Sequence, residues 1–178
     1  MRYSILGLLV TITLFPSFKY WEDYSRWEQK QIANSLDKTN PVSHYLSNPW
    51  LPEDDENTYH LLDVLTSGAG SNRGLEALYF HVFNIICLRA DGALAEGMGE
   101  YCYKVFFSNP DYVFHYVLLQ ESLKGCYVTF LGGYFSMAPD LYPSFCDMLD
   151  SKLTEKGNIK QKPRFLESIR EVISRYEE

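Results

Sequence analysis

Apolar side chains recur at helical spacing along most of this 178-residue chain, and this periodicity limits the fold more than any other feature. The clearest stretch lies near the C-terminus and comprises Phe165, Leu166, Ile169, Val172, Ile173 and Tyr176. These side chains form one stripe, and charged residues and serines occupy the remaining positions, as on an amphipathic helix. Pro163 lies near the predicted start of this helix, where a missing N–H costs little.

The same periodicity predicts further helices over residues 20–36, 57–65, 73–90, 92–107, 110–123, 126–137 and 139–153. The breaks between them contain Gly, Pro or Asn, as in the turn 67–72, in Asn109-Pro110 and at Gly125. Asp91 is expected to cap the helix that follows it. The stretch 127–130 has strand propensity and leaves a short hairpin as an alternative there, but helix is favoured.

Short connections between successive helices make the neighbours antiparallel. We therefore predict an all-α fold of antiparallel helical hairpins. The hairpins either stack as a short solenoid or pack as an irregular bundle.

Residues 1–18 read MRYSILGLLVTITLFPSF, with Arg2 followed by an apolar run. This is the layout of a secretory signal peptide, and it is short for a membrane span of roughly 20 residues. We interpret residues 1–18 as a signal peptide or a membrane anchor, with a buried first helix as the alternative. Because their apolar side chains would cover all sides of a helix, we expect them to lie outside the core. The protein is therefore expected outside the cytoplasm, in the periplasm or secreted. Attachment to the membrane through residues 1–18 is left open.

The rest of the chain divides into three parts. Residues 19–36 are predicted to form an N-terminal helix, and residues 57–178 one helical domain. Residues 37–56 are predicted to be a connector, because Pro41, Pro49 and Pro52 disfavour helix there.

Composition restricts the partners. With 46% hydrophobic and 22% charged residues the chain is typical of a globular domain. A net charge of −7 repels phosphate backbones, which argues against nucleic acid. The acidic run 53–56 lacks the pattern of a calcium loop, and the basic stretch 152–164 is interpreted, like the acidic run, as solvated surface.

The cysteines Cys87, Cys102, Cys126 and Cys146 form an even set, which in an exported chain allows one or two disulfides. The interpretation we favour is buried thiols within apolar helices. The sequence contains no CxxC motif, so neither a redox motif nor a zinc site is indicated.

Other residues of the types that catalyse reactions or bind ligands have simpler interpretations. Glu96 and Glu100 are spaced four apart, but without an ExxH partner motif they are expected on solvated surface. The glycine-rich stretch 68–74 lacks the lysine of a phosphate loop and is expected to be a turn. The histidines show no metal-binding spacing and are His44, His60, His81 and His115. We therefore assign no catalytic, cofactor-binding or metal-ligating residue and expect no cofactor.

The stretch from Ala90-Asp91-Gly92 through Asn109-Pro110-Asp111 resembles one hairpin of a HEAT-like α-helical repeat, as found in small uncharacterised exported bacterial proteins. It combines an Asp-Gly helix start, paired apolar positions and an Asn-Pro-Asp break. The resemblance covers about residues 57–153. It implies a stack of helix pairs and assigns no activity.

These features favour a protein-binding or structural module that acts outside the cytoplasm without catalysis. The alternative is an inhibitor or immunity-type protein that binds a secreted enzyme or toxin, because a negative surface speeds capture of a basic target. An enzyme whose active site assembles from distant residues is a third class.

Overall fold

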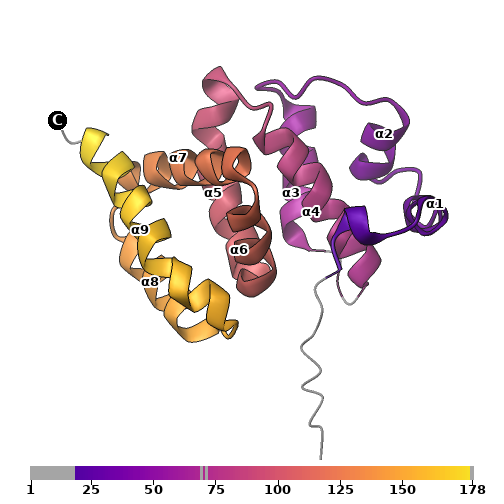
Figure 1. The fold of residues 1–178 in the computed structure, drawn as a ribbon. Helices are drawn as coiled ribbons and strands as arrows, with labels where there is room; N and C mark the ends of the chain where they lie inside the picture. The colour runs from indigo at the N-terminus through magenta and orange to yellow at the C-terminus, as the bar shows by residue number, and fades with distance from the viewer. Residues whose placement is uncertain (1–18, 69, 71, 177–178) are drawn as a thin grey trace, which may run out of the picture.

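The computed structural model describes residues 19–68, 70 and 72–176, and this part of the chain is helical with no strand (Figure 1). A 3-10 helix, η1 (Trp21–Asp23), precedes the α-helices. These are α1 (Arg26–Asn34), α2 (Pro41–Ser47), α3 (Glu56–Ser67), α4 (Arg73–Cys87), α5 (Gly92–Ser108), α6 (Pro110–Leu119), α7 (Glu121–Met137), α8 (Leu141–Lys152) and α9 (Lys156–Tyr176). The predicted all-α fold is confirmed, including helix over residues 127–130.

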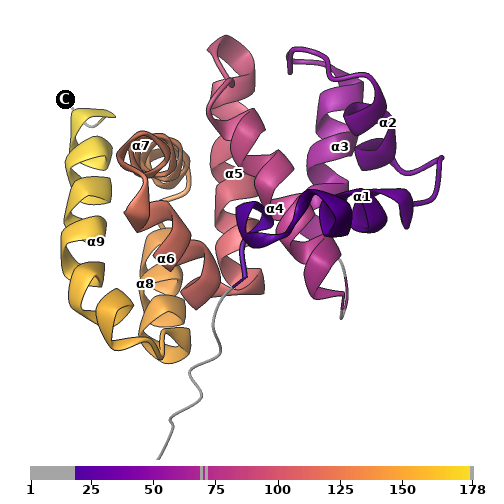
Figure 2. The same cartoon turned by 45° about the vertical axis from the view of Figure 1, so that its right-hand side comes forward.

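The helices pack as an irregular bundle, the second of the two predicted arrangements. Helix α7 packs against α5 on one side and α9 on the other, and α6 contacts all three of these helices. Helices α1 to α4 form the opposite end of the molecule (Figure 2). Helix lengths run from 7 residues in α2 to 21 in α9, so the packed units are unequal.

Two glycines allow the close approach of α7 to its neighbours. A Cβ on Gly99 of α5 would lie 2.5 Å from the Phe130 carbonyl oxygen of α7. A Cβ on Gly132 of α7 would lie 2.5 Å from the Cβ of Val172 in α9. The backbones of these helices are therefore closer than any larger residue permits.

Aromatic side chains fill the core between α5 and the C-terminal helices. The Phe106 ring meets Tyr127 and Phe145 edge to face, at centroid distances of 5.6 and 5.4 Å. Phe114 meets Phe165 edge to face at 5.1 Å. Edge-to-face contact is one of the arrangements that aromatic pairs prefer.

The predicted N-terminal helix over 19–36 is divided in the structure. Helix η1 ends at Tyr24, whose backbone is extended, and α1 begins after Ser25. Ser25 Oγ accepts a hydrogen bond from the Glu28 backbone N–H, and the Glu28 carboxylate accepts one from the Ser25 N–H. This capping box starts a new helix and explains the break.

The predicted connector over 37–56 contains α2, which the proline argument did not anticipate. Pro41 is the first residue of α2, a position where proline is favoured because its missing N–H needs no partner. The Asn40 side chain accepts a hydrogen bond from the Val42 N–H at 2.9 Å and caps the helix. Burial of Val42 and Tyr45 then holds α2 on α3.

Three other boundaries differ from the prediction. The break expected at Gly125 falls at Gln120, whose extended backbone separates α6 from α7, and Gly125 lies within α7. Helix α9 begins before Pro163, which lies inside it. Asp91 occupies the N-cap position of α5, but its side chain makes no capping hydrogen bond.

The predicted signal peptide or anchor, residues 1–18, lies outside the described residues. Among the helices of the described ranges, none combines the length and the apolar character required to cross a membrane.

Candidate functional site

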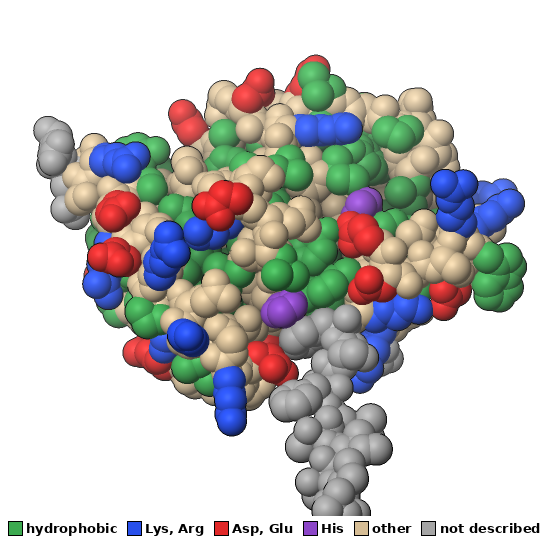
Figure 3. Space-filling view, viewed as in Figure 1, with side chains coloured by type: hydrophobic (Ala, Val, Ile, Leu, Met, Phe, Trp, Pro, Cys, Tyr) green, Lys and Arg blue, Asp and Glu red, His purple; other side chains and the backbone are tan. Residues whose placement is uncertain are grey.

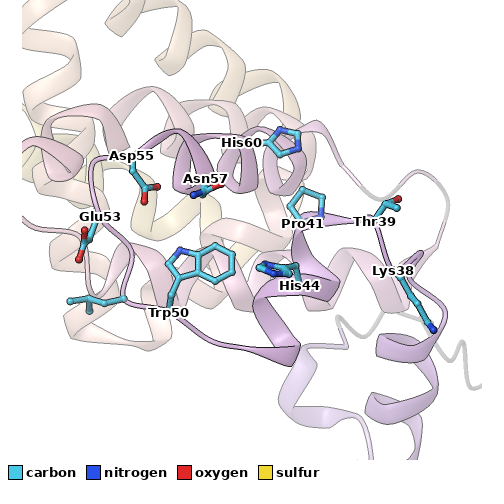
Figure 4. Close-up of a pocket in the computed structure, with 10 residues that line it drawn as sticks. Lys38, Thr39, Pro41, His44, Trp50, Glu53, Asp55, Asn57 and His60 are labelled. Carbon is cyan, nitrogen blue, oxygen red and sulfur yellow. The ribbon is translucent and has the colours of Figure 1, made fainter.

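A cavity of about 630 Å³ opens between α2, the segment 48–55 and the start of α3 (Figure 4). We call it the α2–α3 hollow. It is lined by Lys38, Thr39, Pro41, His44, Trp50, Leu51, Glu53, Asp55, Asn57 and His60. Its volume is in the range that binds small ligands or a few side chains of a partner.

Trp50 forms the centre of the hollow, and aromatic neighbours fix its ring. Tyr45 meets the indole edge to face at a centroid distance of 4.9 Å. His44, which directly precedes Tyr45 in α2, lies 5.6 Å from the indole between ring centroids at an angle of 50°. Because Tyr45 is buried in the core, the indole is held by α2 rather than by the loop alone.

Capping interactions at the start of α3 fix the wall of the hollow that residues 53–58 form. The Asp55 Oδ1 atom accepts a hydrogen bond from the Thr58 N–H at 2.7 Å. Thr58 is fully buried, and its Oγ1 atom accepts a hydrogen bond from the Glu53 N–H at 3.3 Å. These bonds hold the backbone of residues 53–58 and set where the Glu53 and Asp55 side chains emerge.

Several polar side chains of the hollow have no structural task. In the described part of the chain, Lys38, Glu53, Asn57 and His60 make no side-chain hydrogen bond or ion pair, and all four are exposed. The Trp50 Nε1 atom is buried without a hydrogen-bond partner among the described residues. Polar groups that make no hydrogen bond within the fold are available to a ligand. An unpaired buried N–H group also lowers the stability of the folded chain.

Charges of opposite sign are separated across the hollow. Figure 4 shows Glu53 and Asp55 on one side of the indole, with Lys38 on the far side beyond Pro41 and His44. This arrangement can orient a ligand that carries a positive group toward one end and a negative or polar group toward the other. Within the described ranges, no group of His, Cys, Asp and Glu side chains is arranged to hold a metal ion.

A second cavity of about 570 Å³ lies on the other side of α2. It shares Lys38 and His44 with the α2–α3 hollow and extends to Leu36 and Leu46. Cavities on both sides of α2 therefore make the short helix a ridge between two concave surfaces. On the face drawn in Figure 3, acidic and basic side chains are interspersed with exposed apolar ones.

The structure brings His44 and His60 together but keeps the other histidines apart. His81 Nδ1 lies 2.9 Å from Glu22 Oε1, and the His115 ring stacks on Tyr20 at 6.3 Å. The sequence pattern did not predict that His44 and His60 line one cavity. Their separation of 16 positions carries no periodic signal, so only the folding of the connector reveals it.

The remaining candidate residues follow their simpler interpretations. Glu96 and Glu100 are exposed, and Glu100 pairs with Lys104 at 2.7 Å. The cysteines are free thiols in the structure; Cys87 and Cys102 are buried in the core. Burial, together with a hydrogen bond to Cys102, raises the pKa of the Cys87 thiol well above its ordinary value. Cys126 and Cys146 are partly buried.

The turn predicted over 67–72 lies at the connection between α3 and α4, where Ser67 still belongs to α3 and the structure describes residues 68, 70 and 72. Gly68 and Gly70 have positive φ angles of 87° and 64°, which L-residues with a side chain rarely adopt. Asn72 then caps α4 by accepting hydrogen bonds from the Gly74 and Leu75 N–H groups.

Comparisons of the chain with protein-family models, with curated proteins and with solved structures return no match, so the HEAT-like resemblance is not confirmed.

Proposed function

We propose that the chain is a protein-binding module that acts outside the cytoplasm and catalyses no reaction. The observation that carries the proposal is the α2–α3 hollow, in which an aromatic floor is surrounded by exposed polar side chains that the fold leaves unpaired. Aromatic anchors surrounded by polar groups are typical of protein interfaces. A protrusion of a partner chain would fill this cavity and satisfy the free polar groups.

The arrangement of titratable groups supports binding rather than catalysis. The imidazoles of His44 and His60 and the carboxylates of Glu53 and Asp55 lie on different sides of the indole (Figure 4). General acid–base catalysis needs such groups within hydrogen-bond reach of one reacting atom. Turnover of generic esterase, peptidase or phosphatase substrates by the purified chain, lost on substitution of His44 and His60, would contradict this part of the proposal.

The extracytoplasmic location is part of the proposal and rests on the sequence of residues 1–18. Fractionation of cells that make the intact chain should recover it outside the cytoplasm or with the membrane. Recovery in the cytoplasm would contradict the location but leave the binding surface unaffected.

Site-specific photo-crosslinking tests the binding surface. A photoreactive residue at Leu51, which lines the hollow and is 64% exposed, should yield a crosslink to a single protein in the cells that make the chain. Leu119 is 68% exposed but lies on α6, so the same residue there is the matched control. Equal products from both positions, or none from Leu51, would count against the hollow as the binding surface.

A second candidate is an inhibitor or immunity-type protein for a secreted enzyme or toxin. It is favoured by the acidic run 53–56, of which Glu53 and Asp55 line the hollow, in a chain of net charge −7. Acidic surfaces of this kind speed the capture of basic targets. The crosslinked partner decides between the two: an enzyme or toxin inhibited by the purified chain supports this candidate, and a scaffold protein excludes it.

A further inference from the structure

We infer that the acidic wall of the α2–α3 hollow binds the guanidinium group of an arginine side chain in the partner protein. The inference rests on the protein-binding function proposed above and specifies what the hollow recognises. It is carried by three groups that line the cavity: the indole of Trp50 and, on one side of it, the carboxylates of Glu53 and Asp55.

The two carboxylates have acceptor capacity to spare. Asp55 Oδ1 receives the Thr58 N–H, while no hydrogen bond to Oδ2 is present among the described residues. The Glu53 side chain has no hydrogen bond or ion pair within the same range. Asp54, by contrast, does not line the hollow, and it accepts the hydroxyl hydrogen of Tyr59 at 2.6 Å. Of the acidic run, Glu53 and Asp55 therefore line the cavity, and Asp55 also caps α3.

The indole beside these carboxylates completes the chemistry. A guanidinium group is planar, stacks on aromatic rings and donates paired hydrogen bonds to carboxylates. The edge contact from Tyr45 and the tilted contact from His44 hold the indole before a ligand arrives, so little ordering is required on binding. A lysine would gain the charge attraction but not the planar stacking.

Lys38, the cationic side chain of the hollow, is placed so that it does not compete with the guanidinium. It lies on the far side of the cavity from Glu53 and Asp55 and has no ion-pair partner in the described part of the chain (Figure 4). A ligand bound through arginine would therefore direct its next residues toward Lys38, His60 and Asn57. An acidic or polar residue next to the arginine in the partner would interact favourably with these side chains.

A nuclear magnetic resonance titration of the full chain tests the inference. The probe is a blocked pentapeptide with one central arginine among alanines. In two comparison peptides another residue replaces the arginine. One carries citrulline, which keeps the shape of arginine but not its charge, and the other carries glutamate. The readout is the indole N–H resonance of Trp50, with Trp27, which is 70% exposed on α1, as the internal reference.

The arginine peptide should shift the Trp50 signal at millimolar concentration, and the citrulline peptide should bind several times more weakly. Glu53→Gln and Asp55→Asn should each weaken the arginine peptide about fivefold at low salt, which is the upper range for an exposed ion pair. Asn caps a helix as well as Asp does, so Asp55→Asn keeps the fold. Glu56→Gln removes the same charge from the same run outside the lining and should change the affinity by no more than about twofold.

Each other result overturns the inference. A larger Trp50 shift with the glutamate peptide would mean that the hollow recognises an anion. An equal loss of affinity in Glu56→Gln would mean that only the overall charge acts. Absence of any shift would show that the hollow has no arginine site. The crosslink at Leu51 would still test the protein-binding function independently.

Discussion

At the scale of single residues, Asp111 contributes one carboxylate to the N-terminal ends of two helices. It lies in the first turn of α6 and is only 8% exposed. Its Oδ2 atom accepts hydrogen bonds from the Thr154 N–H and hydroxyl, at 2.8 and 2.6 Å, and its Oδ1 atom accepts from the Glu155 N–H and the Asn158 amide, at 3.2 and 3.0 Å. These groups precede or begin α9, where unpaired N–H groups favour a negative charge.

We predict that Asp111→Asn lowers the free energy of unfolding by about 1–3 kcal/mol at neutral pH. Burial alone would raise the pKa of Asp111, but the hydrogen bonds from Thr154, Asn158 and the backbone outweigh it and lower the pKa. The stabilising effect is therefore present above the unfolded pKa of about 4 and is lost as pH falls through the lower folded pKa. Urea unfolding of both proteins from pH 7 to pH 3 should show the difference shrinking as the solution becomes acidic. Glu121→Gln, at an exposed first-turn glutamate, is the control. A difference that is constant with pH would contradict this account.

Glycines of α7 provide a second prediction at the same scale. Gly132→Ala should cost roughly 1–3 kcal/mol, because the new methyl group meets Val172 and the helices must separate. Gly125→Ala places the same methyl group in open space on the same helix and should stabilise by about 0.5–1 kcal/mol. Thermal unfolding of the two variants measures both effects. Equal changes for the pair would show that α7 and α9 are not in close contact.

Individual residues differ in how far the sequence predicts their role. Gly68 and Gly70 could be placed in a turn because a glycine-rich break between two apolar runs has few other structures. His44 and His60 could not be placed together, because nothing local relates two side chains on different helices. The candidate site was therefore missed although each of its residues was visible in the sequence.

At the scale of elements, apolar periodicity predicted α3 to α9 as helices, and local capping moved their boundaries. The prolines of residues 37–56 disfavour helix in most positions, but the sequence Asn40-Pro41 is also a helix start. In the same way, Ser25 and Glu28 form a capping box that the apolar stripe of residues 20–36 concealed. Both signals concern helix starts and lie in the polar positions that a search for apolar stripes ignores.

One carboxylate adds polar contacts to the aromatic contacts that attach the segment including η1 to the bundle. Glu22 Oε1 accepts the Tyr116 hydroxyl hydrogen at 2.8 Å and lies 2.9 Å from His81 Nδ1. Burial, together with this bond to Glu22, raises the pKa of Tyr116 to about 12. The carboxylate thus joins η1 to both α6 and α4.

We predict that Glu22→Ala speeds proteolysis of the η1 segment, by severalfold, while the unfolding temperature changes little. The reason is that few buried contacts other than those of Tyr20 and Trp21 hold this segment, so it opens locally. Limited proteolysis with mass spectrometry measures the cleavage rate. Glu100→Gln, which removes the exposed ion pair with Lys104, should leave that rate unchanged. An unchanged rate in Glu22→Ala would mean that the aromatic contacts alone attach η1.

At the scale of the whole molecule, the sequence predicted the class of fold but left the arrangement open between a regular stack and an irregular bundle. The contacts of α7 with both α5 and α9 decide this, and they depend on Gly99 and Gly132, whose role appears only when the helices meet. The same arrangement places α1, α2 and α3 at one end of the molecule, where the α2–α3 hollow lies. The proposed function therefore belongs to the N-terminal end, while helices α5 to α9 supply most of the buried aromatic side chains among the described residues.

The most direct test of the account is hydrogen exchange of the full chain with and without the protein that crosslinks at Leu51. The account predicts slower exchange over residues 38–60, which hold the lining of the hollow, and unchanged exchange in α8 and α9. Protection confined to α8 and α9, or no protection of residues 38–60, would contradict the central claim that this hollow is the binding surface.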